Sequence, residues 1–213
     1  MSDAVTRLNV ALRGLMALLP ASLLLLQVGC GQSRGVRPLP LLPALPAGVT
    51  AEVSEVSYIV RGTTVPEIRL SLRTAATSTL GSDTVGLHSS RLNLEFGYTQ
   101  QGNHCVMNEV TIRLESAIQV PEWTERGRAD FRVVAMWDRY VRAVRAHEYT
   151  HREHLYSRAR DISQELYHIK SPTCASMQSR VRSTAARIND RYRQLSEQFD
   201  EESRGTITWP PNE

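Results

Sequence analysis

Between Asp130 and His168 the chain reads DFRVVAMWDRYVRAVRAHEYTHREHLYSRARDISQELYH. Apolar and aromatic residues recur here at spacings of three, four or seven, which is the period of one face of an α-helix. The residues on this face are Val133, Trp137, Tyr140, Val144, His147, His151, Leu155, Ile162, Leu166 and Ile169. The pattern predicts one long helix over about residues 130–168, with two histidines on the face that points toward the core.

The motif His147-Glu148-Tyr149-Thr150-His151 lies in the middle of this helix. Positions i and i+4 lie one turn apart on the same face, so the two imidazoles can bind one metal ion. Glu148 is then placed to accept a proton from a water molecule beside the ion, an arrangement typical of zinc-dependent hydrolases. His147 and His151 are therefore predicted Zn²⁺ ligands, and Glu148 is the predicted general base. The alternative is a pair of core histidines without a metal. A neutral imidazole on an apolar face needs a partner for its nitrogen atoms, which favours the metal.

Residues 1–30 are organised like an export signal. Arg7 and Arg13 supply positive charge, and an apolar run follows from Leu15 to Leu26 that is too short for a membrane-spanning helix. The run ends in Leu26-Gln27-Val28-Gly29-Cys30, which resembles the lipobox of bacterial lipoproteins although Gln27 stands where leucine is usual. We expect lipidation of Cys30 and attachment to a membrane in the periplasm or at the outer membrane. Simple cleavage near Gly29, with secretion, and an uncleaved anchor are the alternatives.

The chain has three cysteines, an odd number for an exported protein. If Cys30 carries lipid, Cys105 and Cys174 remain as a pair. An oxidising compartment outside the cytoplasm allows these two to form a disulfide. The alternative is two unpaired, buried thiols.

Composition divides the remainder of the chain into a linker, one domain and a tail. Residues 31–50 alternate proline with leucine and small residues, which is typical of an extended spacer. Residues 51–206 are long enough for one domain with its own core, and residues 207–213 form a C-terminal tail.

The net charge is only +3, and the sequence has no basic patch interleaved with aromatic residues. Nucleic-acid binding is therefore not expected.

Within the domain, period-two and helical patterns follow one another along the chain. They predict a strand over 52–61, a helix over 64–73 with a capping box, and a loop over 77–90. Two strands near 91–98 and 106–114 follow, joined by a turn at 101–103. A second long helix begins at Ser171 and Pro172 and ends near Glu202. The short connection between the long helices implies that they pack antiparallel. The predicted fold is α+β: a small antiparallel sheet packed on two long antiparallel helices, with the histidine motif on the first.

Several separated motifs together resemble the bacterial family of predicted secreted zinc-dependent proteases, long catalogued as a domain of unknown function. The motifs are Tyr58-x-Val60-x-Gly62-x-Thr64-x-x-Glu67-Ile68, Cys105-Val106, Pro121-x-Trp123, Trp137-Asp138-Arg139, His147-Glu148-x-x-His151-Arg152, Cys174 and Phe199-Asp200. The resemblance covers roughly residues 52–206. It implies an exported, zincin-like metallopeptidase that cleaves peptides or proteins, with His147 and His151 as zinc ligands and Glu148 as general base.

The third zinc ligand is left open by the sequence. Relatives often carry a histidine near the end of the second helix, where this chain reads Asp200-Glu201-Glu202-Ser203-Arg204-Gly205. His154 lies too far along the helix axis from His147 to share one ion with it. The candidates are the acids of the second helix, namely Asp190, Glu197, Asp200 and Glu202. Without a third ligand the chain would be an envelope-tethered binding or scaffold domain that keeps the fold. A zinc hydrolase acting on cell-wall material is a further alternative.

Overall fold

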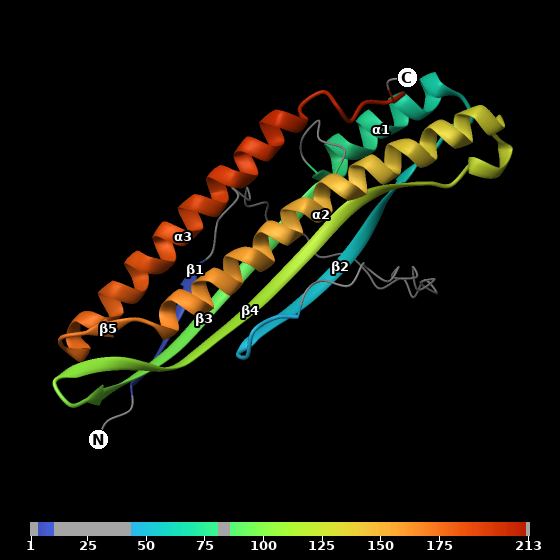
Figure 1. Cartoon of the computed structure of the whole chain (residues 1–213). Helices are drawn as coiled ribbons and strands as arrows, with labels where there is room; N and C mark the ends of the chain where they lie inside the picture. Colours follow the sequence, from blue (N-terminus) through green and yellow to red (C-terminus); the bar gives the residue numbers. More distant parts are fainter. Residues whose placement is uncertain (1–3, 11–43, 81–85, 212–213) are drawn as a thin grey trace, which may run out of the picture.

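The structure, a computed structural model, describes residues 4–10, 44–80 and 86–211 (Figure 1). Cys30, most of the predicted export signal and the linker up to residue 43 lie outside the described residues. The described part of the predicted signal forms a strand, Ala4–Val10, which pairs with the domain. Among the described residues, no helix combines the length and apolarity that a membrane span requires.

The described residues form a mixed α+β fold with a small sheet and three α-helices. In chain order the elements are β1 (Ala4–Val10), β2 (Val49–Val60), α1 (Val65–Leu80), β3 (Leu87–Gln101), β4 (His104–Trp123), a 3₁₀ turn (Arg126–Arg128), α2 (Phe131–Tyr167), β5 (Lys170–Ser171) and α3 (Cys174–Ser203). The long helices α2 and α3 run alongside each other against the sheet, and α1 packs near one end of it (Figure 1).

The sheet has the strand order β1-β3-β4-β2, with β5 added to the start of β4. The predicted antiparallel pair is confirmed as β3 and β4, and Gly102 adopts a positive φ of 60° in the turn between them. The prediction of a purely antiparallel sheet is wrong, because β2 pairs with β4 in parallel. The chain crosses over through α1 and then runs back along β3, so β4 returns in the direction of β2.

The first helix is longer than predicted, and the loop predicted over 77–90 is mostly wrong. Helix α1 extends to Leu80 and β3 begins at Leu87. Serine and threonine lower helix propensity without forbidding a helix, and Ile68, Leu72 and Ala76 give α1 a buried face that stabilises it. The glutamate half of the predicted capping box is present: the Glu67 carboxylate accepts hydrogen bonds from the backbone N–H groups of Thr63 and Thr64, at 2.7 and 3.1 Å.

The two long helices pack antiparallel, because residue numbers fall along α2 as they rise along the α3 residues in contact with it. Glu165 pairs with Arg187, Asp161 with Arg191 and His154 with Ser196. Helix α2 begins after Asp130, whose side chain accepts from the N–H of Arg132 at 2.8 Å.

The predicted start of the second helix is wrong by a few residues. Thr173, and not Ser171, is the N-cap of α3, and its hydroxyl accepts from the N–H of Ser176. Ser171 is drawn into β5, where it pairs with Cys105. This strand pairing takes the backbone of Ser171 away from a helix.

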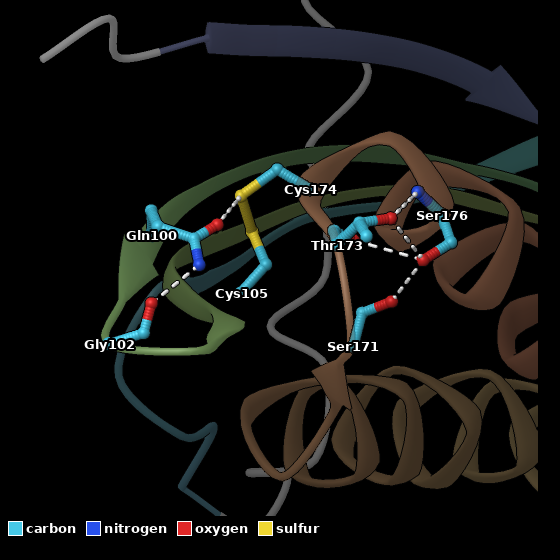
Figure 2. Close-up of a disulfide and its surroundings, with 7 residues drawn as sticks. All are labelled: Gln100, Gly102, Cys105, Ser171, Thr173, Cys174 and Ser176. Atoms are coloured by element: carbon cyan, nitrogen blue, oxygen red, sulfur yellow. Dashed lines mark hydrogen bonds between the residues drawn. A yellow bond between two sulfur atoms is a disulfide. The ribbon is translucent and has the colours of Figure 1, made fainter.

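Cys105 and Cys174, the pair inferred from the cysteine count, are joined by a disulfide with a Cα–Cα distance of 5.0 Å. The bond ties the start of β4 to the first residue of α3, beside the short β5 pairing (Figure 2). Ser171, Thr173 and Ser176 form a hydroxyl network next to it, with the Ser171–Ser176 oxygen atoms 2.6 Å apart. The turn between α2 and α3 is therefore fixed to the sheet.

The interior contains two apolar clusters that meet different halves of α2. One lies between α1, the ends of β2 and β4, and the N-terminal half of α2 up to Val144. The other lies between β3, β4, α3 and the C-terminal half of α2 from Leu155 onward. The predicted tail joins the first cluster through Trp209, whose ring lies 5.6 Å from that of Trp137. Between Val144 and Leu155 the inward face of α2 is polar.

Candidate metal centre

The polar part of the inward face of α2, between Val144 and Leu155, contains the histidine motif. His147 and His151 lie one turn apart, with their ring centroids 4.8 Å from each other and their Nε2 atoms at 3.1 Å. Both side chains are largely buried, at 18% and 14% exposure. Burial lowers the pKa of His151, which favours the neutral imidazole that a metal ion needs.

Helix α3 brings one of the four candidate acids to these histidines. Asp200 Oδ1 lies 3.2 Å from the Nε2 atom of His147 and 2.8 Å from that of His151. The three residues form a group whose potential ligand atoms all lie within 4.8 Å of one another. Asp200 is half exposed, so the group opens to solvent on one side.

The other candidate acids have different partners. Asp190 and Glu197 both pair with Arg193, at 3.6 and 2.9 Å, and Glu202 accepts a hydrogen bond from Gln198. His154 also stays outside the group, with its Nδ1 atom 3.2 Å from the hydroxyl of Ser196. Of the acids that the sequence left open, only Asp200 is placed to share an ion with the two histidines.

The orientation of the first histidine is fixed by α3. The Nδ1 atom of His147 lies 3.2 Å from the hydroxyl oxygen of Ser203, and this hydroxyl donates to the backbone carbonyl of Phe199 at 2.7 Å. With the serine proton used in that bond, the tautomer of His147 that carries its proton on Nδ1 can donate to the serine oxygen, and it leaves the lone pair of Nε2 available for a metal ion. The Phe199 ring stacks on His147 with centroids 4.7 Å apart and also contacts His151. The histidine is thereby held with its free nitrogen toward Asp200.

Glu148 is the acid beside the group. It is only 5% exposed, and burial raises the pKa of its carboxyl group from 4.5 to about 7, with a further contribution from the charge of Asp200. The backbone of Gly86 lies directly against it: a Cβ atom at position 86 would sit 2.9 Å from Cδ of Glu148. A carboxyl group that titrates near neutral pH can both accept and return a proton.

His88 is a neighbour of the site that the sequence prediction missed. Its ring stacks on that of His151 with centroids 6.3 Å apart, and its Nε2 atom lies 2.8 Å from the hydroxyl of Ser116. Burial lowers the pKa of His88 to about 4, and the charges of Arg158 and Arg152, and of His151 when it is protonated, act in the same direction. His88 is therefore a neutral imidazole at the edge of the site. The alternation of Leu92, Leu94 and Phe96, extended backward in steps of two, reaches position 88 and is the signal that would have found it.

Two cavities meet at the group of histidines and acids. The larger, of about 760 Å³, is lined by Gly86, Val144, Glu148 and Ile207 among others. The smaller, of about 380 Å³, extends the other way between α2 and α3. His88, His151, Ser196 and Asp200 line both cavities. A ligand that passes the candidate metal centre can therefore occupy space on each side of it.

A family model described as "Bacterial protein of unknown function (DUF922)" matches residues 56–206. No curated protein and no solved structure matches the chain. The matched range begins in β2 and ends just after α3, so it contains the histidine motif, Asp200, His88 and both cysteines of the disulfide.

Proposed function

The chain belongs to this bacterial family of unknown function, and we propose that it is an exported zinc-dependent metallopeptidase. The observation that carries the proposal is the meeting of His147, His151 and Asp200 beside a buried glutamate. Two imidazoles and one carboxylate form a donor set suited to catalytic zinc, which takes three protein ligands and keeps a fourth position for water or substrate.

The spacing of the donor atoms supports zinc. A tetrahedral ion with bonds of about 2.0–2.1 Å holds its ligand atoms about 3.3 Å apart. The three donor atoms are separated by 3.1, 3.2 and 2.8 Å, so one ion can reach all three after small adjustments. The hydrogen bond from His147 Nδ1 to Ser203 supplies the outer contact that usually orients a metal-binding histidine.

Glu148 is the proposed general base. Zinc, when bound, supplies a Lewis acid that makes a neighbouring water more acidic and polarises the substrate carbonyl. Glu148 accepts a proton from the attacking water, and it returns this proton to the amide nitrogen as the peptide bond breaks. Its burial keeps the proton affinity of the carboxylate close to that required at neutral pH.

The proposed setting is the cell envelope, with peptides or proteins as substrates. The disulfide supports this, since disulfides persist in oxidising compartments outside the cytoplasm. The sequence adds the proposed lipid anchor at Cys30, which would hold the domain to a membrane through the proline-rich linker that precedes β2.

The test measures zinc content and peptide cleavage for the full exported chain. We expect one zinc per wild-type chain, and Glu148→Gln to keep zinc and lose cleavage. Asp200→Ala is expected to lower zinc affinity by more than the roughly 10- to 100-fold typical of losing an outer-shell partner. Asp190→Ala, on the same helix but paired with Arg193, is the control and should retain zinc.

Two results would reject the proposal. A wild-type chain that binds no zinc, or that binds zinc and cleaves no peptide, supports instead a tethered binding or scaffold domain. Cleavage that survives Glu148→Gln would remove the assigned general base.

A further inference from the structure

Arg158 lies on α2 seven residues after His151, and therefore on the same face of the helix. It lines the smaller cavity together with His88, Ser90 and His154. Its Nε atom is buried and has no hydrogen-bond partner among the described residues. Burial lowers the pKa of Arg158, and no carboxylate of the described part of the chain offsets this effect.

The acids on the wall of the same cavity are already engaged. Asp190 and Glu197 pair with Arg193, and Asp200 lies against His147 and His151. Other arginines at the interface between the helices also have carboxylate partners: Arg187 pairs with Glu165 and Arg191 with Asp161. Arg158 has no such partner among the residues that the structure describes. A half-buried guanidinium at the wall of a cavity is thus left to bind an external anion.

A second arginine strengthens the positive potential behind the cavity. Arg152 is only 2% exposed, and its Nε and Nη1 atoms are buried without a hydrogen-bond partner in the described structure. Its guanidinium lies over the ring of Tyr149, 4.5 Å from the centroid, a contact that leaves its charge in place. The charges of Arg152 and Arg158 both lower the pKa of His88, which lines the smaller cavity, so both charges contribute to the positive potential at this part of its wall.

We propose that the smaller cavity binds a carboxylate of the peptide substrate, with Arg158 as its cationic anchor. The planar guanidinium matches a carboxylate in shape and donates paired hydrogen bonds to it. Ser90 and Asn189 add polar side chains to the wall. Because the cavity shares His151 and Asp200 with the candidate metal centre, an anchored carboxylate places a nearby peptide bond at that centre. The inference rests on the proposed peptidase function and names its substrate class.

The carboxylate has two possible sources, the C-terminus of a peptide or the side chain of aspartate or glutamate. The probe is a hexapeptide library made with free and with amidated C-termini, in which glutamate alternates with glutamine at matched positions. Cleavage at a fixed distance from the C-terminus that amidation abolishes identifies a terminal carboxylate. Cleavage at a fixed distance from an acidic residue, whatever the terminus, identifies a side chain.

The variants are Arg158→Gln, Arg158→Lys and the control Arg160→Gln, which changes an arginine on the same helix that lines neither cavity. We expect Arg158→Gln to lower kcat/KM for the carboxylate-bearing peptide by about thirtyfold or more. The matched neutral peptide should be unaffected, Arg158→Lys should retain part of the preference, and Arg160→Gln should behave as wild type. Equal losses for both peptides, or no preference in the wild type, would overturn the inference.

A binding measurement keeps this inference separate from the proposed function. The same fluorescent peptides are titrated by anisotropy against zinc-loaded Glu148→Gln, with and without Arg158→Gln. Tighter binding of the carboxylate form that depends on Arg158 supports the subsite even if the wild type cleaves nothing, in which case the peptidase proposal fails alone. Equal binding of both forms rejects the subsite whatever the outcome for cleavage.

Discussion

Gly86 offers a test of whether the position of Glu148 controls activity. A Cβ atom at position 86 would lie 2.9 Å from Cδ and 3.0 Å from Cγ of Glu148, and closer still to Oε1, whereas ordinary contacts begin at 3.4 Å. In Gly86→Ala the carboxylate must therefore move by about half an ångström to one ångström. A displacement of about 1 Å at a reacting group can lower the rate about 100-fold, so we expect kcat/KM to fall on the order of 10- to 100-fold.

The fold and the zinc content of Gly86→Ala should stay near those of the wild type. The atom that must give way is the end of a flexible side chain, and φ at Gly86 is not in the left-handed region. The assay compares peptide cleavage, zinc stoichiometry and thermal unfolding of Gly86→Ala with those of Gly127→Ala, where an added Cβ meets nothing within 4 Å. Activity within about threefold of the wild type would refute the reasoning, because this change is far below the effect expected from a shifted base.

Three further predictions concern the surroundings of the site. Ser203→Ala should weaken zinc binding about 10- to 100-fold in a competition titration, because His147 loses the partner of its Nδ1 atom, and unchanged affinity would contradict this. Cys174→Ser should lower the free energy of unfolding by about 4 kcal/mol in urea titrations, since the disulfide closes a loop over a separation of 69 residues. In metal-free protein, the folded pKa of His88 (about 4) lies below the ordinary histidine pKa of 6.5, so the unfolded chain binds more protons between these two pH values. Stability should fall as the pH decreases through this range, and His88→Asn should make the fall shallower when unfolding is compared at about pH 7 and about pH 5.

The periodicity of the sequence was enough to predict the long helices and the β3–β4 hairpin. A period of three and four residues defines α2 whatever its neighbours are, and two alternating segments around Gly102 define a hairpin locally. The direction in which β2 pairs was not predictable in the same way. Alternation identifies a strand, but the partner of the strand is decided by the crossover through α1.

There is a physical reason why the sequence prediction missed His88. His88 lies in a segment rich in serine, threonine and glycine, a composition that favours a loop when it is judged locally. Pairing with β4 over the whole of β3 overrides this local preference and places His88 opposite Ile118 in the register. Tertiary pairing, and not local propensity, therefore brings this histidine to the candidate metal centre.

The position of Asp200, the proposed third ligand, depends on the register between α2 and α3, which neither helix specifies alone. Asp200 lies about 39 Å along α3 from Cys174, and a shift of one residue in the packing would turn it by about 100° around the helix axis. At the N-terminal end of α3 this register is fixed by the disulfide and the β5 pairing. At the C-terminal end of α3 it is fixed by the contacts of Asp200 and Ser203 with His151 and His147. An ion bound to residues of both helices would cross-link the C-terminal end of α3 to α2, as the disulfide links the N-terminal end of α3 to the sheet. The position of Asp200 beside the histidines therefore follows from the packing of α3 along its whole length, and not from any local sequence motif.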